Sequence, residues 1–207
     1  MTLKSRLSLL SLSAAVVFLA ASASAFASPM YTIDFSCSNG SATTTNFCVP
    51  TPPVSPLAFN GWTQNGYNVA SNSGAWNWTP ASGNPAPSLS STAASTLLVT
   101  KGASTEFYFD SVDIQDAGGF TYMIVGKLDG NTVYSITSGS ISGPGWYTAS
   151  AFGGDLVDSV YITVTPTSGT DYVDNVVVTD TPEPTSMLLL GTGLLGLAAM
   201  VRRRMAH

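Results

Sequence analysis

The chain has 207 residues, of which 9% are charged, and its 12 acidic and seven basic residues give a net charge of −5. All the acids lie between Asp34 and Glu183, where Lys101 and Lys127 are the only bases, so this stretch carries 2 − 12 = −10. An acidic surface excludes nucleic-acid binding by this part of the chain and disfavours acidic polysaccharides, whereas neutral glycans and divalent cations fit it.

Residues 1–27 have the layout of a secretory signal peptide. Two basic residues in the first six are followed by a mostly apolar stretch over residues 7–21 and then by a run of small residues. Ala25 and Ala27 stand at the −3 and −1 positions, which predicts cleavage before Ser28, with cleavage after Ala25 as the alternative. The small-residue run argues against an uncleaved anchor. The expected partners are the Sec translocon and signal peptidase.

The stretch that follows, up to about residue 87, is rich in proline and Asn-Gly pairs and contains both cysteines, Cys37 and Cys48. In an oxidising compartment these two are expected to pair as a local disulfide. Closing a loop of this length contributes roughly 2–3 kcal/mol in the chain-entropy picture. A metal site at these cysteines is the weaker alternative, because the only histidine is His207 at the end of the chain.

Strand patterns become clear beyond residue 94. Short apolar and β-branched runs are separated by glycine-containing turns every 8–14 residues, and none has a helical period. The expected strands are Met30–Ser36, Ser95–Thr100, Thr105–Ile114, Phe120–Leu128, Thr132–Thr137, Trp146–Ala151, Ser159–Thr165 and Tyr172–Thr179. Short strands at this spacing predict an all-β fold, an antiparallel β-sandwich of the jelly-roll type with about eight strands.

The C-terminus has three parts in order: Pro182-Glu183-Pro184, an apolar run over residues 187–201, and the basic cluster Arg202-Arg203-Arg204. As a helix the apolar run would be about 22 Å long, which is short for a hydrocarbon core of about 30 Å. It is therefore a marginal transmembrane helix with its arginines on the cytoplasmic side. The two prolines favour an extended backbone, the conformation that a protease cleft binds.

This tripartite tail resembles the PEP-CTERM sorting domain. The resemblance implies recognition by an exosortase, a membrane cysteine protease that cleaves at or near Pro182-Glu183-Pro184 and passes the ectodomain to the cell surface or extracellular matrix. It also implies a Gram-negative host that makes exopolysaccharide, and a precursor held in the inner membrane before processing. A simple C-terminal anchor behind a proline-stiffened linker is the alternative.

Short segments of the middle region, within residues 106–114, 125–130, 158–163 and 172–178, resemble the jelly-roll modules found in PEP-CTERM proteins. Those modules are similar in turn to carbohydrate-binding modules of the galactose-binding type. The expected organisation is a signal peptide over residues 1–27, a β-sandwich ectodomain over residues 28–180 and a sorting signal over residues 181–207.

The absence of histidine from the ectodomain excludes Ser-His-Asp and Cys-His catalysis there. Paired carboxylates are the remaining catalytic alternative, a glycan hydrolase drawing on the four acids Glu106, Asp110, Asp113 and Asp116. Because acids in a strand and its turn usually mark solvent-facing positions, we expect a non-enzymatic surface or matrix protein associated with exopolysaccharide. A dedicated carbohydrate-binding module is the main alternative.

Two binding sites follow as expectations. Jelly rolls often tie their first and last strands with a structural calcium ion, and Asp34, Asp171 and Asp174 are the candidate ligands here. No other cofactor is expected. Trp76 and Trp78 lie in a stretch bounded by glycine and proline and are candidates for stacking on a sugar ring. The alternative is that these two tryptophans, which share one strand face, belong to the core. Trp146 is expected in the core.

Overall fold

The computed structural model describes residues 28–35, 40–42, 56–79, 87–102, 105–116, 118–143, 145–150 and 154–181, and nine positions between 191 and 205. Met30–Asp180 is one compact unit, and the two ends of the chain form a second. The predicted signal helix over residues 1–27 lies outside the described residues, as do the two cysteines and the Pro-Glu-Pro tripeptide. The described positions between 191 and 205 are helical.

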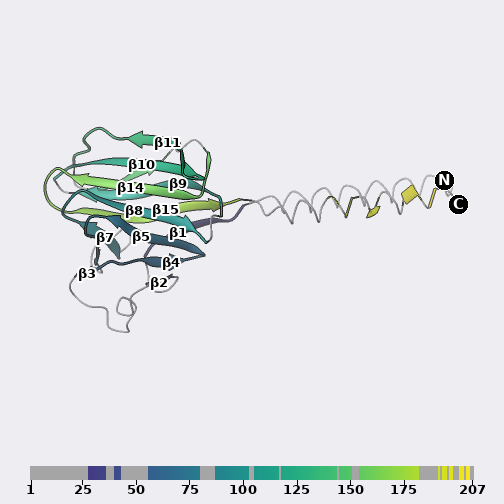
Figure 1. Ribbon diagram of the computed structural model, residues 1–207, viewed down its shortest axis with the longest axis horizontal. Coiled ribbons are helices and arrows are strands. Elements are labelled where there is room, and N and C mark those ends of the chain that lie inside the picture. The colour runs from purple at the N-terminus through teal and green to yellow at the C-terminus, as the bar shows by residue number, and fades with distance from the viewer. Residues whose placement is uncertain are drawn as a thin grey trace, which may run out of the picture. The chain divides into compact units, whose positions relative to one another are not determined.

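Met30–Asp180 folds into two antiparallel sheets packed face to face (Figure 1). Sheet A runs in the order β12-β9-β15-β7-β6-β3, with β1 also paired to β15 and β13 to β9. Its strands are β1 (Met30–Ile33), β3 (Leu57–Ala58), β6 (Asn77–Thr79), β7 (Ser88–Ser91), β9 (Phe107–Asp116), β12 (Trp146–Ser150), β13 (Leu156–Val157) and β15 (Asp171–Asp180). Sheet B runs β11-β10-β14-β8-β5-β4-β2. Its strands are β2 (Gly40–Ala42), β4 (Trp62–Gln64), β5 (Tyr67–Ser73), β8 (Ser95–Lys101), β10 (Phe120–Leu128), β11 (Asn131–Thr137) and β14 (Ser159–Pro166).

The predicted antiparallel β-sandwich is confirmed. The eight strands expected from the sequence all form, and β10 has the predicted bounds Phe120–Leu128. The sheets also contain short strands that the sequence did not predict, mainly in the turn-rich stretch between residues 40 and 91. Most of these strands have only two or three residues, too few to produce a readable alternation. The seven-residue β5 is the longest exception, and it pairs with β4 and β8.

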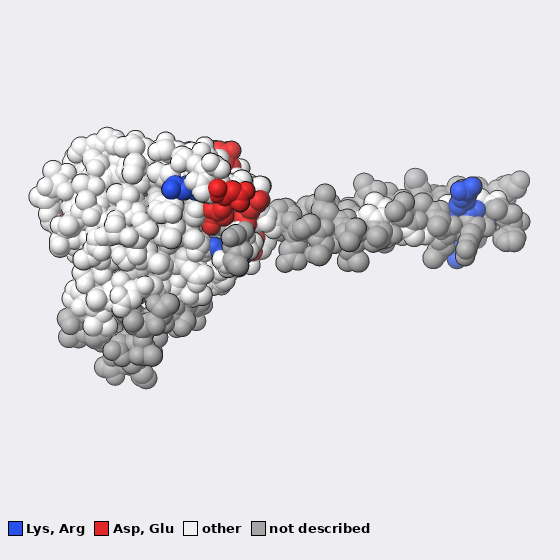
Figure 2. All heavy atoms as spheres, in the orientation of Figure 1, with Lys and Arg blue, Asp and Glu red and all other residues white. Residues whose placement is uncertain are grey.

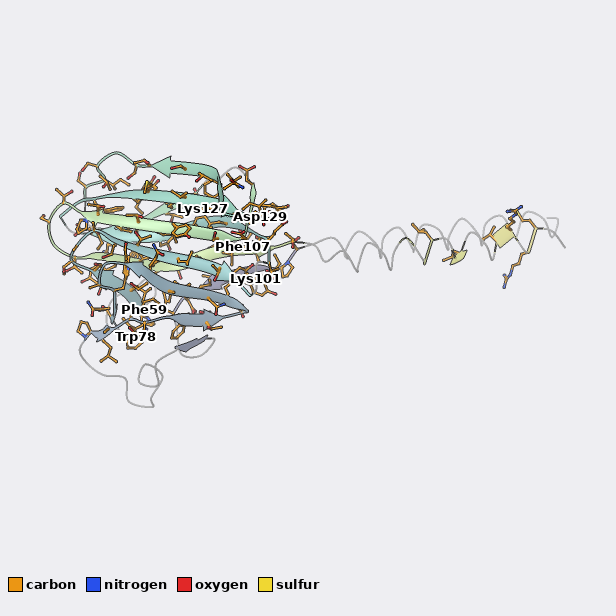
Figure 3. The ribbon with its side chains drawn as sticks, viewed as in Figure 1. Phe59, Trp78, Lys101, Phe107, Lys127 and Asp129 are labelled. Atoms are coloured by element: carbon orange, nitrogen blue, oxygen red, sulfur yellow. The ribbon has the colours of Figure 1, made fainter. Side chains whose placement is uncertain are left out.

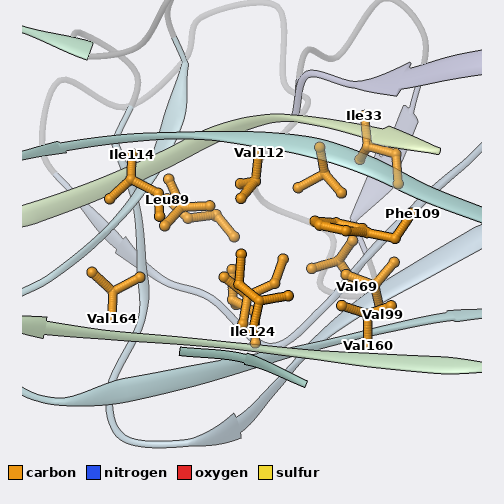
Figure 4. Close-up of a cluster of buried hydrophobic side chains, with 14 of the residues drawn as sticks. Ile33, Val69, Leu89, Val99, Phe109, Val112, Ile114, Ile124, Val160 and Val164 are labelled. Carbon is orange, nitrogen blue, oxygen red and sulfur yellow. The ribbon is translucent and has the colours of Figure 1, made fainter. Parts of the chain in front are cut away.

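The core lies between the two sheets, where alternate residues of each strand point inward (Figure 4). Side chains of sheet A meet side chains of sheet B across this layer. Fully buried members include Ile33, Leu89, Val112, Ile114 and Val178 from sheet A, and Val69, Val99, Ile124, Val160 and Ile162 from sheet B. β-Branched residues suit this position, because they pack well on a pleated surface while favouring the strand conformation.

Candidate functional site

The best candidate for a binding surface is the outer face of sheet A over β12, β9 and β15. Strand alternation directs the even-numbered residues of β12 away from the core, and they pair with the odd-numbered residues of β9. Trp146, Gln115 and Tyr172 are direct register partners across the three strands. All three are partly exposed. A partly exposed aromatic thus stands at each end of one cross-strand row, with an amide between them.

A polar network lies beside this row. The Thr148 hydroxyl donates to Oδ1 of Asp113 at 2.6 Å, and the Asn175 amide donates to Oδ2 of the same carboxylate at 3.0 Å. These bonds hold Asp113 between β12 and β15 and fix its orientation. Asn175 has φ 46°, at a β-bulge where the register of β15 shifts against β9. Bulges re-aim side chains in this way next to binding sites.

The chemistry of this face suits an uncharged polyhydroxylated chain. Trp146 and Tyr172 are two strand spacings apart, about 9–10 Å between backbones. Their rings offer apolar faces on which sugar rings can stack. Gln115, Asn175 and Thr148 supply donors and acceptors for hydroxyl groups. We call these residues, with Asp113, the outer-face site: Trp146, Tyr172, Gln115, Asp113, Thr148 and Asn175.

The tryptophans have the reverse of their predicted roles. Trp76 and Trp78 are each only 2% exposed, so their rings belong to the core and the glycan contact expected there is corrected. The Trp78 indole N–H donates to the carbonyl of Phe35 at 3.3 Å, which satisfies its one polar group inside the protein. Trp146, expected in the core, lies on the outer face instead. Its strand is at the edge of sheet A, and only the alternate positions there point inward.

The three candidate calcium ligands are placed apart. Asp171 points into the interior, whereas Asp174 stands three residues further along β15, on the opposite side by alternation. Asp34 accepts a hydrogen bond of 2.9 Å from the Gln64 amide. Within the described segments, no three acidic, histidine or cysteine side chains converge as a metal site. Calcium binding by this set therefore stays a prediction.

The four acids considered as catalytic residues of a hydrolase also lie in different surroundings. Asp116 is buried in the interior, whereas Asp113 is bound on the outer face. The Asp110 carboxylate accepts a 2.7 Å hydrogen bond from Thr179. Glu106 precedes β9 and is exposed. Each of the three acids in β9 thus accepts hydrogen bonds from different partners. The absence of an enzymatic activity stays a prediction.

The end of the last strand is firmly anchored before the C-terminal tail begins. Lys101 Nζ lies 2.6 Å from Oδ1 of Asp180, the last residue of β15. The Tyr67 hydroxyl donates to the same carboxylate, and Lys101 Nζ lies 5.5 Å from the centre of the Tyr67 ring. Burial and the Asp180 carboxylate raise the pKa of Tyr67. Lys101 and Phe107 lie together at this end of the sandwich (Figure 3).

The first and last strands of the ectodomain are direct neighbours. Met30 pairs with Thr179 and Ile33 with Val176, so β1 begins where β15 ends. β15 is also central in sheet A, with β9 on one side and β7 and β1 on the other. On the face shown in Figure 2, acidic side chains gather at one end of the sandwich and the rest is almost uncharged. Contacts elsewhere on that face therefore depend on hydrogen bonding and apolar surface.

Comparison with family models identifies the segment that follows this anchored strand. Residues 180–204 match the PEP-CTERM protein-sorting motif. The chain carries a PEP-CTERM sorting signal. The signal begins at Asp180 and therefore directly continues the last strand of the ectodomain. It directs the protein to export and to the cell surface. Arg202 and Arg204 of the signal are described and exposed, whereas Arg203 and the Pro182-Glu183-Pro184 tripeptide lie outside the described residues.

The described part of the sorting signal includes no helix that is both long enough and apolar enough to cross a bilayer. A search of curated proteins found no match to the chain. Solved structures with a similar arrangement are carbohydrate-binding modules. A mutant of the family 29 module CBM29-2 is 12% identical, with TM-score 0.35, and the match covers 75% of this chain and 94% of that one.

Two further structures belong to this group. The module TmCBM61, in complex with β-1,4-galactotriose, is 10% identical with TM-score 0.35, over 56% of this chain and 90% of that one. The family 11 module from Clostridium thermocellum, in complex with a β-1,3-1,4-mixed-linked tetrasaccharide, is 17% identical with TM-score 0.34, over 62% and 99%. Scores at this level are too low to assign a ligand to this chain.

The outer-face site was missed at the level of sequence because Trp146 was assigned to the core. One signal was available. Trp146, Thr148 and Ser150 alternate with Tyr147 and Ala149, which gives one polar side and one apolar side with an aromatic on each. The pairing with β9 that assembles the site joins residues 31 to 39 positions apart in the chain, and no local pattern reveals it.

Proposed function

We propose that this chain is the precursor of a non-enzymatic bacterial surface or matrix protein whose ectodomain contacts a neutral exopolysaccharide. The observation that carries the first half of this proposal is the sorting motif at residues 180–204. In the proposed sequence of events, the Sec translocon exports the chain and signal peptidase cleaves before Ser28. The helix over residues 187–201 then holds the precursor in the inner membrane of a Gram-negative cell, with Arg202–Arg204 in the cytoplasm.

The anchoring of β15 supports this order of events. Because β15 pairs with β1, β7 and β9, sheet A is complete only after the last strand has crossed the membrane. The sorting signal follows Asp180 directly, and Lys101 and Tyr67 hold that residue in place. Exosortase would therefore meet Pro182-Glu183-Pro184 immediately beside a folded domain. The two prolines of the tripeptide favour an extended backbone, the conformation that a protease cleft binds.

Processing in the native host tests this half of the proposal. Replacing Glu183 with Gln and both prolines of the motif with Ala is expected to leave unprocessed precursor in the inner-membrane fraction. Glu106→Gln, which removes an exposed acid outside the motif, is the matched control and should be processed normally. Release of the motif variant to the surface at the wild-type level would refute the role of the tripeptide.

The outer-face site supports the second half of the proposal. Two partly exposed aromatics in one row, beside a fixed Asp113 and an Asn175 amide, give the combination of stacking surface and hydrogen-bonding groups that neutral sugars need. The acidic stretch between Asp34 and Glu183 disfavours anionic polymers for the same ectodomain. A dedicated carbohydrate-binding module remains the alternative, and it would use the same face.

Glycan binding by residues 28–181 tests this part. This segment contains the complete core. We expect Trp146→Ala and Tyr172→Ala each to weaken binding about two- to twelvefold, the loss of one aromatic contact of about 0.5–1.5 kcal/mol. Tyr161→Ala is the matched control, because Tyr161 is an aromatic of β14 in the other sheet. Equal losses in all three variants, or no binding to any neutral glycan, would remove the outer-face site from the proposal.

A further inference from the structure

The strand β11 (Asn131–Thr137) forms one outer edge of sheet B. It pairs with β10 on one side, and no described strand pairs with its other side (Figure 1). Among the described strands at the ends of the two sheets, β11 is the longest, with seven residues against five in β12, three in β2 and two in β3. A free edge presents a row of backbone N–H and C=O groups to which another strand can add.

The sequence of β11 lacks the residues that usually protect such an edge. It contains no charged residue and no proline, and the chain has no Asp, Glu, Lys or Arg from Asn131 to Gly154. Five of its seven residues are β-branched or aromatic, the types that favour strands. A bulge interrupts the pairing with β10 at Val133, where the register shifts. The regular part of the edge, Tyr134–Thr137, is therefore open to pairing with another strand.

The side chains of this edge are complementary to those of a second copy. Tyr134 and Ile136 pack against the core, whereas Ser135 and Thr137 are exposed on the outer side of sheet B. In an antiparallel pair centred on Ser135, Tyr134 of each copy lies opposite Ile136 of the other, and Ser135 lies opposite Ser135. Pairs of an aromatic and a β-branched residue are favourable across strands, and this arrangement forms two of them. A two-fold axis through Ser135 also keeps the outer faces of both sheets on the same side.

The distribution of charge favours this antiparallel arrangement. The charged residue nearest to β11 in the sequence is Asp129, in the turn that leads into the strand. It lies at the end of the sandwich where the acidic side chains gather (Figures 2 and 3). In the antiparallel pair the two turns are about 25–30 Å apart, which is more than three Debye lengths of about 8 Å at physiological ionic strength. A parallel pair would instead place the two acidic ends side by side, where they repel each other.

We propose that β11 pairs antiparallel with β11 of a second copy of this chain, so that sheet B continues from one ectodomain into the other. Because each copy contributes one β11, the pairing closes at two copies and does not propagate into a fibre. A single strand edge is a small interface, so the dimer is weak and forms where the chain is concentrated, as on a cell surface. The dimer carries two outer-face sites, and binding of both to one polymer strengthens attachment. That gain rests on the proposed glycan binding, whereas the dimer itself does not.

Sedimentation velocity of the full chain in detergent, over a series of protein concentrations, tests the proposal. The wild type should show a concentration-dependent dimer. Ser135→Lys places two ammonium groups opposite each other at the centre of the pair and should weaken the dimer at least about tenfold. Thr165→Lys, at an exposed position of β14 inside sheet B, is the control and should dimerise as the wild type does. A wild type that stays monomeric at about 1 mM, or a Ser135→Lys variant that dimerises as the wild type does, overturns the proposal.

Disulfide trapping tests the register of the pair. Ser135→Cys brings two thiols face to face on the two-fold axis, so mild oxidation should produce a covalent dimer. Thr132→Cys, at an exposed position of the same strand, should not, because the two copies of residue 132 are about 20 Å apart in this register. The wild type, which carries Cys37 and Cys48, gives the background. The proposal is overturned if Ser135→Cys gives no more covalent dimer than the wild type, or if Thr132→Cys cross-links as readily.

Discussion

Raising the pH is expected to lower the thermal stability of the protein, because the folded state holds a proton on Asp171, buried beside its register partner Asp116, that the unfolded state has already lost. Burial, followed by the neighbouring Asp116 carboxylate, raises the pKa of Asp171 from 3.8 to about 8. Its contribution to stability is complete below pH 3.8 and is lost progressively as the pH rises to about 8. Between these values the folded state carries one more proton than the unfolded state, so stability falls as the pH increases.

The size of the stability loss follows from the one extra proton that the folded state binds. The free energy of unfolding should fall by about 1.4 kcal/mol per pH unit, or about 3 kcal/mol between pH of about 5.5 and 7.5. For a chain of this size that lowers Tm by about 6–11 °C. Burial raises the pKa values of Tyr67, Tyr122 and Tyr134 above the ordinary 10.0, so these phenols do not titrate in the same window.

Thermal unfolding, followed by circular dichroism across this pH range, measures the effect. Asp171→Asn has no proton to lose and should show a much flatter profile. A wild-type Tm that is constant with pH, or an Asp171→Asn profile as steep as the wild type, would refute the buried acid pair as described.

Two further expectations concern the stability of the ectodomain, and denaturant unfolding checks both. A Cβ on Gly126 would lie 2.3 Å from the ring of its register partner Tyr134, so Gly126→Ala should cost about 1–3 kcal/mol, and adding Tyr134→Ala should cost less than the sum of the two changes. Replacing Cys37 and Cys48 with Ser should cost about 2–3 kcal/mol under oxidising conditions and nothing after reduction, if the predicted disulfide forms.

Strands with their own alternation could be predicted from the sequence. In β14 the inward residues Val160, Ile162 and Val164 alternate with polar or aromatic outward ones, and the strand lies where the pattern placed it. The stretch from residue 57 to residue 79 is rich in turn-forming residues and no strand was predicted there, yet it contains β3 to β6. Its Asn65-Gly66 pair does form a turn, but the strands on each side are completed by long-range pairing with sheet neighbours.

Sites formed by the pairing of distant strands could not be predicted from the sequence. Asp116 and Asp171 are 55 residues apart, and only the register of β9 against β15 places them together. Trp146 was expected in the core because it lies inside a strand pattern. In an edge strand, however, no further strand covers the outer side, so aromatics on both faces of the strand keep contact with solvent. Tyr147, on the other face of β12 from Trp146, is 40% exposed, and its ring centre lies 6.0 Å from that of Tyr122.

Intact-mass measurement of the mature protein from its native host tests the sorting account most directly. The account predicts a chain that begins at Ser28 and has lost Arg202–His207, with its new C-terminus at or near the Pro-Glu-Pro tripeptide. In cells that lack the processing protease, the same measurement should return a chain that extends to His207. Mature surface protein from normal cells that still carries Arg202–His207 would contradict the account.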